Sequence, residues 1–149
     1  MPELVGYRAE HAELCARVWR GALLLSVGAP RTGAATVFAP EPPRPDGRRI
    51  LVAPGLGVAV LDEIEPVHRS ARLSIATLAD PAGLLGAAIA VARDRLHLHR
   101  LFGVLRSDAD TEAEVVAGQG FSAEVTIPNH LWVDGGLRAG TIWGRCLDD

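Results

Sequence analysis

The sequence predicts an α+β protein with α/β three-layer architecture, in which a sheet is covered by helices. Three observations support this prediction. Short apolar or alternating segments bounded by glycine and proline recur along the chain, apolar residues at helical spacing appear in three separate segments, and the 149 residues are 48% hydrophobic. A chain of this size and composition can bury a substantial core, so we expect one domain that spans residues 1–149.

The first third of the chain predicts a strand, a helix and a proline-rich arm. Residues 4–7 are expected to form the strand. Residues 28–49 contain five prolines and are expected to form a loop or arm, within which residues 35–38 form a brief strand. Residues 9–20 predict a helix from the spacing of four residues: Ala12, Cys15, Ala16 and Trp19.

The middle of the chain predicts three strands. Residues 49–53 and 56–61 flank Pro54-Gly55 and indicate a hairpin with a tight turn. Residues 71–77 predict the third strand, in which successive side chains point to opposite faces of the sheet. One face has Ala71, Leu73 and Ile75, and the other has Arg72, Ser74 and Ala76.

A helix and a buried strand are expected next. Asp80 is suited to be an N-cap and Pro81 to be the first helical residue, so the helix begins there and continues to about residue 96. A buried strand is expected at residues 101–105. The apolar stripe of the helix consists of Leu85, Ile89, Ala92 and Leu96.

The last part of the chain predicts a helix and two strands. Thr111 and Glu114 have the spacing of a capping box, so we expect the helix to begin there and to end at residues 118–120. The two strands are expected at residues 121–127 and 137–143.

Composition excludes several classes of function. All fifteen basic residues are arginine and the net charge is −3, which argues against a nucleic-acid partner and against a polybasic membrane surface. The absence of lysine excludes a Schiff-base lysine and a Walker phosphate loop. Cys15 and Cys146 lie outside any C-x-x-C pair, so we expect two free thiols, with a disulfide between them as the alternative. With no secretory signal and no apolar run of about 20 residues, the expected location is cytoplasmic.

Four short segments carry a family likeness through their order and spacing. They are His68-Arg69-Ser70-Ala71, residues 92–101, Gly120-Phe121, and residues 130–135 together with the closing residues 142–145. This pattern resembles the GNAT superfamily of N-acetyltransferases, and most closely the branch that includes the ribosomal-protein N-terminal acetyltransferases. The resemblance covers residues 68–145.

The resemblance implies a mixed, mostly antiparallel, twisted sheet of six to seven strands with helices on both faces. It also implies a splay between the fourth and fifth strands, here residues 71–77 and 101–105. In the family acyl-CoA lies in this gap, so the resemblance implies acetyl-CoA or another acyl-CoA as cofactor, and the amine of a small molecule or peptide as acceptor. The pantetheine arm would pair with the backbone of Leu73, Ser74 and Ile75.

The family's seat for the CoA diphosphate is altered in this sequence. That seat is a glycine-rich loop at a helix N-terminus, where free N–H groups and the helix dipole meet the phosphates. Here residues 76–81 contain no glycine; Pro81 removes one N–H, and Asp80 as N-cap would use another. Gly83 and Gly86 are either a displaced phosphate-binding signal or packing glycines within the helix.

Other positions of the family's site also differ. Val116 stands where many members have a tyrosine that acts as general acid, and Arg72 stands where a glutamate often acts as base. Ser107 is near the position of an asparagine that usually follows the fifth strand, and the resemblance makes it a candidate contact for the CoA.

Acyl transfer to an amine needs a base near the amine, and donors for the thioester oxyanion. The alternative for each candidate base is a structural role, as a solvated loop charge or a turn residue. Trp132 and Asp134 form either a substrate-binding rim or a hairpin stabilised by Asp-Gly turn chemistry. The candidate bases are Glu63, Glu65, His68 and His130.

The sequence also indicates what lines the cleft and what it lacks. Phe102, Val116 and Leu73 are expected to line the hydrophobic gap between the splayed strands and to contact the substrate. The five histidines have neither an i, i+4 pair nor an H-E-x-x-H motif, so no metal site is predicted.

Three functions stay open at this point. The first is a GNAT-type N-acyltransferase. The second is a GNAT-like fold that has lost CoA binding and serves as another biosynthetic enzyme, such as a cyclase or decarboxylase acting on an apolar intermediate. The third is a ligand-binding or dimerising module, in which the proline-rich arm and the tryptophans contact a partner such as a second copy of the chain.

Overall fold

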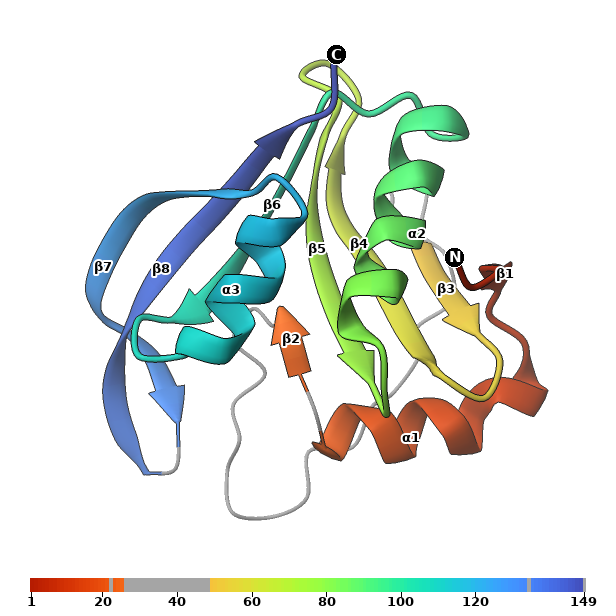
Figure 1. Cartoon of the computed structure of the whole chain (residues 1–149), viewed down its shortest axis with the longest axis horizontal. Coiled ribbons are helices and arrows are strands. Elements are labelled where there is room, and N and C mark those ends of the chain that lie inside the picture. The colour runs from red at the N-terminus through yellow and green to blue at the C-terminus, as the bar shows by residue number, and fades with distance from the viewer. Residues whose placement is uncertain (22, 26–48, 134, 149) are drawn as a thin grey trace.

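The computed structural model describes residues 1–21, 23–25, 49–133 and 135–148. Within these residues, seven strands follow one another across a twisted sheet in the order β1-β3-β4-β5-β6-β8-β7, and an eighth strand, β2, pairs with β5 off this path (Figure 1). Every neighbouring pair on the path is antiparallel except β5 and β6, which run parallel. The predicted α+β class and the mixed, mostly antiparallel sheet are confirmed.

The elements follow the predicted order, with a 3-10 turn (η1) and the strand β2 added near the N-terminus. The first six are β1 (Val5–Gly6), η1 (Ala9–His11), α1 (Ala12–Gly21), β2 (Leu23–Leu25), β3 (Arg49–Ala53) and β4 (Gly57–Glu65). The last six are β5 (Ser70–Thr77), α2 (Pro81–Asp94), β6 (Arg100–Arg106), α3 (Asp110–Gly118), β7 (Ser122–Val133) and β8 (Gly136–Cys146).

The proline-rich arm predicted over residues 28–49, and the brief strand within it at residues 35–38, lie outside the described residues. The exception is Arg49, the first residue of β3. The hairpin predicted around Pro54-Gly55 is confirmed: the N–H of Leu56 donates to the carbonyl of Ala53 at 3.0 Å, and β3 and β4 pair on either side of the turn.

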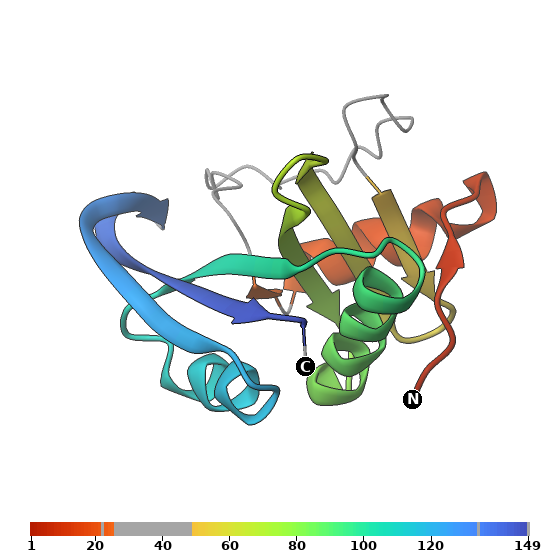
Figure 2. The ribbon, with the colours of Figure 1, turned by 90° about the horizontal axis from the view of Figure 1, so that it is seen from above.

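Helices cover both faces of the sheet, as Figure 2 shows. α1 packs on one face, and α2 and α3 pack on the other. Because side chains alternate along each strand, the central strands supply both cores. The core under α2 and α3 includes Leu61, Leu73, Ile75, Leu85, Leu101 and Val116. The smaller core under α1 includes Cys15, Val18, Val52, Val58, Val60 and Ala76.

The helix starts test the capping predictions. Asp80 caps α2 as predicted, because its side chain accepts a hydrogen bond from the N–H of Gly83. The predicted capping box at Thr111 is wrong: α3 begins at Asp110, its N-cap is Ala109, and no side chain caps it. A turn that closes from the N–H of Ala109 to the carbonyl of Arg106, at 3.0 Å, starts the helix before Thr111 is reached.

The predicted apolar stripe of the first helix is wrong in part. Ala12 is exposed, whereas His11, Cys15 and Val18 are buried against the sheet. The face of α1 that packs on the sheet continues from His11, in the preceding 3-10 turn, through Cys15 and Val18, which are spaced by four and three residues. Cys15 and Cys146 are both free thiols, as predicted, and burial raises the pKa of Cys15.

Hydrogen bonds hold β5, β6 and the end of the chain together at one end of the sheet. The N–H of His99 donates to the carbonyl of Arg69 at 2.7 Å, and the N–H of Leu147 donates to the carbonyl of His99 at 2.8 Å. The His99 ring lies between the Arg69 guanidinium, 3.0 Å from its Nε2, and the carboxylate of Asp148. Because a guanidinium only donates, Nε2 accepts from Arg69, and the Nδ1–H group donates to the carboxylate of Asp148.

Arg100 and Glu124 join β6 to β7 across the intervening strand. Both guanidinium-to-carboxylate hydrogen bonds measure 2.6 Å, and Arg100 also lies 5.9 Å from the centre of the Phe102 ring. Gly144 of β8 leaves room for this pair, since a Cβ there would lie 2.3 Å from Glu124 Oε1. The hydrogen bonds from Arg100 lower the pKa of Glu124.

We predict that Glu124→Gln lowers the free energy of unfolding by about 1 kcal/mol at neutral pH, the upper range for a partly exposed ion pair. The folded-state pKa of Glu124 is below its ordinary value of 4.5, so the pair's contribution is complete above that pH and is lost as the pH falls through the folded-state pKa. Urea unfolding between pH 7 and pH 3 should show the two curves converging in acid. A difference in the free energy of unfolding between the two proteins that does not change with pH would contradict this prediction. The control is Glu114→Gln, because Glu114 is exposed.

Candidate active site

The sheet opens between β5 and β6. Their parallel ladder consists of three pairs: Ser70 with Arg100, Ala71 with Leu101, and Arg72 with Phe102. No further pair joins these two strands in the described chain, although β5 continues to Thr77 and β6 to Arg106. Figure 1 shows the two ribbons diverging. The splay predicted between residues 71–77 and 101–105 is therefore confirmed.

Part of the edge of β5 that β6 leaves is covered by β2. This strand runs antiparallel to β5 and pairs Leu23 with Ala76 and Leu25 with Ile75. Figure 1 shows β2 in the opening between β5 and β6. Between the last β6 pair and the first β2 pair, Leu73 and Ser74 have ladder partners in β4 alone among the described strands. This two-residue stretch of backbone lies where the two strands begin to diverge.

The side chains around the opening belong to two different faces. Leu73, Leu105 and Val116 are buried in the core under α2 and α3. Phe102 is half-buried on the other face, because it is one residue out of phase with Leu101 and Leu105. The prediction that Phe102 lines one cleft together with Leu73 and Val116 is wrong for this reason.

The start of α2 holds a carboxylate where the resemblance places the CoA diphosphate. Asp80 has a left-handed backbone (φ 49°, ψ 59°), and its Oδ1 accepts the Gly83 N–H at 3.0 Å. A Cβ on Gly83 would lie 2.0 Å from Asp80 Oδ2, so the space above this glycine is already filled. Gly83 and Gly86 both lie within α2, which agrees with the packing alternative. A diphosphate does not fit this helix turn.

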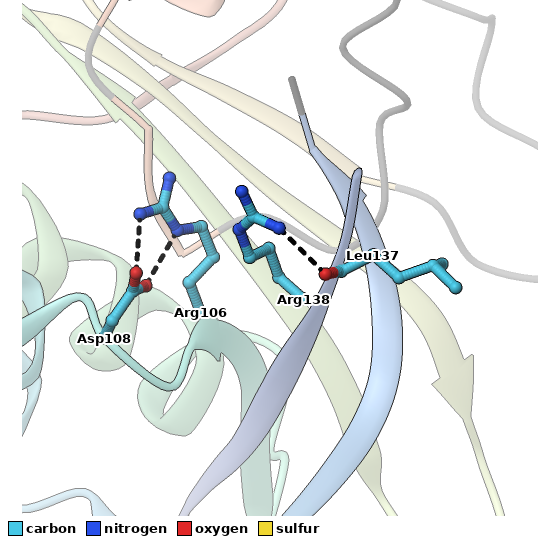
Figure 3. Close-up of polar contacts among 4 residues, drawn as sticks. All are labelled: Arg106, Asp108, Leu137 and Arg138. Atoms are coloured by element: carbon cyan, nitrogen blue, oxygen red, sulfur yellow. Dashed lines mark hydrogen bonds and ion pairs between the residues drawn. The ribbon is translucent and has the colours of Figure 1, made fainter. Parts of the chain in front are cut away.

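Two arginines mark the open end of β6 (Figure 3). Arg106 makes a bidentate ion pair with Asp108 at 2.9 and 3.0 Å, and Arg138 donates to the carbonyl of Leu137 at 3.0 Å. The hydrogen bonds from Arg106, with a smaller contribution from the charge of Arg138, lower the pKa of Asp108. Ser107 is exposed beside them.

Glu63 belongs to a cluster of charges on β4 and β5. It sits at an irregularity of β4 with φ 49°, and its Oε1 lies 3.1 Å from the Arg72 guanidinium. Asp62 lies 3.7 Å from the same guanidinium. The Nε of Arg72 is buried and makes no hydrogen bond with any residue that the structure describes. Sequence reasoning noted Arg72 only as a departure from the family; the β4–β5 register, which sets Asp62 opposite Arg72, brings the cluster together.

Glu65 is the last residue of β4, where it pairs with Ser70, and His68 lies in the turn that follows, so both are at the paired end of β5, away from the opening. Glu65 Oε1 accepts the N–H of Val67 at 3.0 Å and so shapes this turn. His68 is exposed in the same turn. Because the turn precedes the paired start of β5, neither side chain is near Leu73–Ser74.

His130 lies over β8 at the open half of the sheet. A Cβ on Gly140 would be 3.1 Å from His130 Cδ2 and 3.1 Å from Val104 Cγ1, so both side chains crowd the same face of β8. This is the face that Phe102 shares, since Val104 and Phe102 are two residues apart on β6. Trp132 lies on β7 opposite Leu137. Asp134 lies outside the described residues.

The backbone is similar to solved structures of spermidine N-acetyltransferases. A chimera of SpeG from Vibrio cholerae and hSSAT gives a TM-score of 0.65 at 17% identity, over 70% of each chain. Dodecameric SpeG from Vibrio cholerae in an intermediate state gives 0.65 at 18% identity, over 69% of this chain and 67% of that one. The same enzyme in complex with manganese ions gives 0.60 at 18% identity, over 67% and 64%. The chain has the GNAT fold.

This GNAT fold is recognised from the backbone and not from overall sequence similarity. Neither the protein-family models nor the curated proteins match the sequence. Among the described residues, no three His, Cys, Asp or Glu side chains are placed together to hold a metal ion. The described helices include none with the length and hydropathy required to cross a membrane.

We predict that two glycines of α2 respond differently to alanine. Gly86→Ala should raise the free energy of unfolding by up to about 1 kcal/mol, since the new methyl group meets Gln119 Oε1 at 3.4 Å and alanine favours a helix. Gly83→Ala should not raise the free energy of unfolding. Its methyl group displaces the Asp80 carboxylate, so the N-cap hydrogen bond, which contributes about 1 kcal/mol, is lost.

The Asp80→Ala background provides the control for this comparison. With the cap already absent, Gly83→Ala should stabilise α2 as much as Gly86→Ala does, as measured by urea unfolding. Equal effects of the two alanines in the native background would show that Asp80 does not fill the space above Gly83.

Proposed function

We propose that the protein is an N-acyltransferase that moves an acyl group from an acyl thioester to the amine of a small molecule. The observation that carries the proposal is the splay, where the Leu73–Ser74 backbone has no strand partner on the β6 side among the described residues. The backbone likeness to spermidine N-acetyltransferases supports the same type of reaction. The amine of a peptide is the alternative acceptor.

The chemistry requires little from the protein beyond positioning and one proton transfer. The amine nitrogen attacks the thioester carbonyl carbon, the C–N bond forms, and the C–S bond breaks. A backbone N–H at Leu73–Ser74 that points toward β6 is suited to donate to the oxygen that becomes negative. The amine loses a proton to a base, and the departing thiolate takes up a proton.

His130 is the base that the geometry favours. It lies on the face shared by Phe102 and Val104, beside the open half of β6. The neutral imidazole has one ring nitrogen without a proton, which can accept the proton that the amine loses. Glu63 is the second candidate, held by Arg72 on the β5 side of the opening. Glu65 and His68 are not included, because Glu65 ends β4 opposite Ser70 and His68 lies in the turn that follows, at the paired end of β5.

A second function is favoured by a separate observation. The carboxylate of Asp80 fills the helix turn that would receive a diphosphate, and β2 covers part of the β5 edge. Both features suit a GNAT-like protein that binds an apolar ligand and transfers no acyl group. Such a protein would act as another biosynthetic enzyme or as a binding module, and a homodimer would be its simplest partner.

The deciding experiment measures thioester turnover. The full-length Cys146→Ser variant, which lacks the exposed thiol, is mixed with acetyl-CoA and a panel of amines that includes spermidine, monoamines, amino-acid amides and short peptides. Released thiol and acetylated amine are quantified by a thiol reagent and mass spectrometry. Amine-dependent release supports the acyltransferase. Calorimetry that detects no binding of any thioester at millimolar concentration favours the second function.

We predict that His130→Gln lowers kcat by about 100-fold, the lower range for loss of a general base. The KM for the amine should change by less than about threefold in the same variant, whereas a role in binding the amine would raise KM and leave kcat nearly unchanged. His97→Asn is the matched control, because His97 is exposed and has φ 51°, which asparagine tolerates.

We also predict that a bound acyl donor displaces β2. A thioester arm that pairs with Leu73 and Ser74 continues toward Ile75 and Ala76, where β2 is hydrogen-bonded. Hydrogen exchange of the amides of residues 23–25 should therefore accelerate when the donor is added, while exchange in the β3–β4 hairpin stays the same. Unchanged or slower exchange in β2, under conditions of measured turnover, would mean that the arm follows another path.

A further inference from the structure

We propose that this site recognises its donor by the acyl group and the pantetheine arm, and gives no binding energy to the nucleotide end of CoA. The inference rests on the proposed acyltransferase function and specifies its donor class: acyl thioesters of pantetheine or a similar amide-containing arm, for which the 3′-phospho-ADP group is dispensable.

The backbone N–H groups near the start of α2 are already engaged. The N–H of Leu78 donates to the carbonyl of Leu56 at 2.9 Å, and that of Ala79 donates to Thr77 Oγ1 at 3.1 Å. The N–H of Gly83 donates to the Asp80 carboxylate. Pro81 has no N–H.

This count leaves Asp80 and Ala82 as the only amides of residues 78–83 for which the described structure gives no acceptor. A diphosphate is normally held at a helix start by several convergent N–H groups. Two isolated amides, one of them on the residue that carries the carboxylate, do not form such a cradle.

The connection into α2 is too short to supply a different cradle. Three residues, Leu78 to Asp80, join the end of β5 to the first residue of α2. Thr77 fixes this connection, because its hydroxyl contacts the carbonyls of Leu56 and Ala79 as well as the N–H of Ala79. A loop of this length, anchored at both ends, offers one amide without an acceptor, that of Asp80, which is too few to wrap a phosphate.

The local charge also opposes a nucleotide. Both helices on this face begin with carboxylates: Asp80 at α2, and Asp110 and Glu112 at α3. Arg106 is on the same face as Phe102 and Val104, which is the face opposite α2, and its guanidinium is paired with Asp108. The positive ends of the two helix dipoles thus already lie beside carboxylates of the protein, where a phosphate would be repelled.

The pantetheine arm of the donor, in contrast, has binding groups in the opening between β5 and β6. The Leu73–Ser74 backbone can form strand-like hydrogen bonds with the amide groups of the arm, and these bonds do not depend on charge. Leu73 and Leu105 give the opening an apolar side. We therefore expect recognition to end where the arm meets the first phosphate.

The test compares acetyl-CoA with acetyl-pantetheine on the full-length protein, by kcat/KM and by calorimetry. We expect the affinities for acetyl-CoA and acetyl-pantetheine to differ by less than about threefold. A diphosphate site with two charge-assisted hydrogen bonds would instead favour acetyl-CoA by about 100-fold or more. Free adenosine 3′-phosphate 5′-diphosphate should not compete with either donor, and the ratio should not change between low and high salt.

Three outcomes separate the proposals. Equal use of the two donors supports the inference. A strong preference for acetyl-CoA that weakens with salt overturns the inference and leaves the acyltransferase intact. No binding and no turnover with either donor overturns the acyltransferase, and the donor class with it.

A variant tests whether Asp80 causes the loss of nucleotide recognition. Asp80→Gly frees the N–H of Gly83, and glycine accepts the left-handed conformation at this position. It should raise kcat/KM severalfold for acetyl-CoA alone. The control Asp94→Asn removes one negative charge at the other end of α2 and should leave the ratio of the two donors unchanged. An unchanged ratio in Asp80→Gly would overturn the role assigned to Asp80.

Discussion

A parallel ladder of three residue pairs between β5 and β6 is the constraint on which the site depends. His99 strengthens the start of this ladder, since its backbone joins Arg69 to Leu147 and its ring lies between Arg69 and Asp148. Beyond Arg72 and Phe102 the two strands follow different partners, β4 on one side and β8 on the other. Because their paired ends are fixed, the divergence of their free ends opens the sheet at a defined place.

What fills the opening differs from what a GNAT fold leads one to expect. The strand β2 forms two pairs with β5 where a pantetheine arm would lie, and the Asp80 carboxylate takes the N–H group that a phosphate would bind. Both are contacts of the chain with itself, so any ligand competes with them. A donor held through its arm alone faces only the first competition, whereas a donor held through its diphosphate faces both.

The two faces of the opening have different chemistry. Toward α2 and α3 the side chains are apolar and buried, as Leu73 and Val116 are. Toward the other face lie Arg72 with its two acidic neighbours, and His130 beside Val104. The two faces of the sheet at Leu73–Ser74 therefore differ in polarity, apolar toward α2 and α3 and charged toward the other face.

The sequence by itself determined the element order, the alternation along β5, the Asp80–Pro81 start of α2 and the family likeness, because these depend on neighbours a few residues apart. It also indicated that the diphosphate seat was altered, since Asp80 and Pro81 act through their own backbone. Only the tertiary structure decided that Phe102 faces away from Leu73 and that Glu65 and His68 lie at the paired end of β5. It also decided that Arg72 meets Asp62 and Glu63, and that β2 enters the splay. Those facts depend on strand register and on pairing between segments some fifty residues apart, which no local pattern specifies.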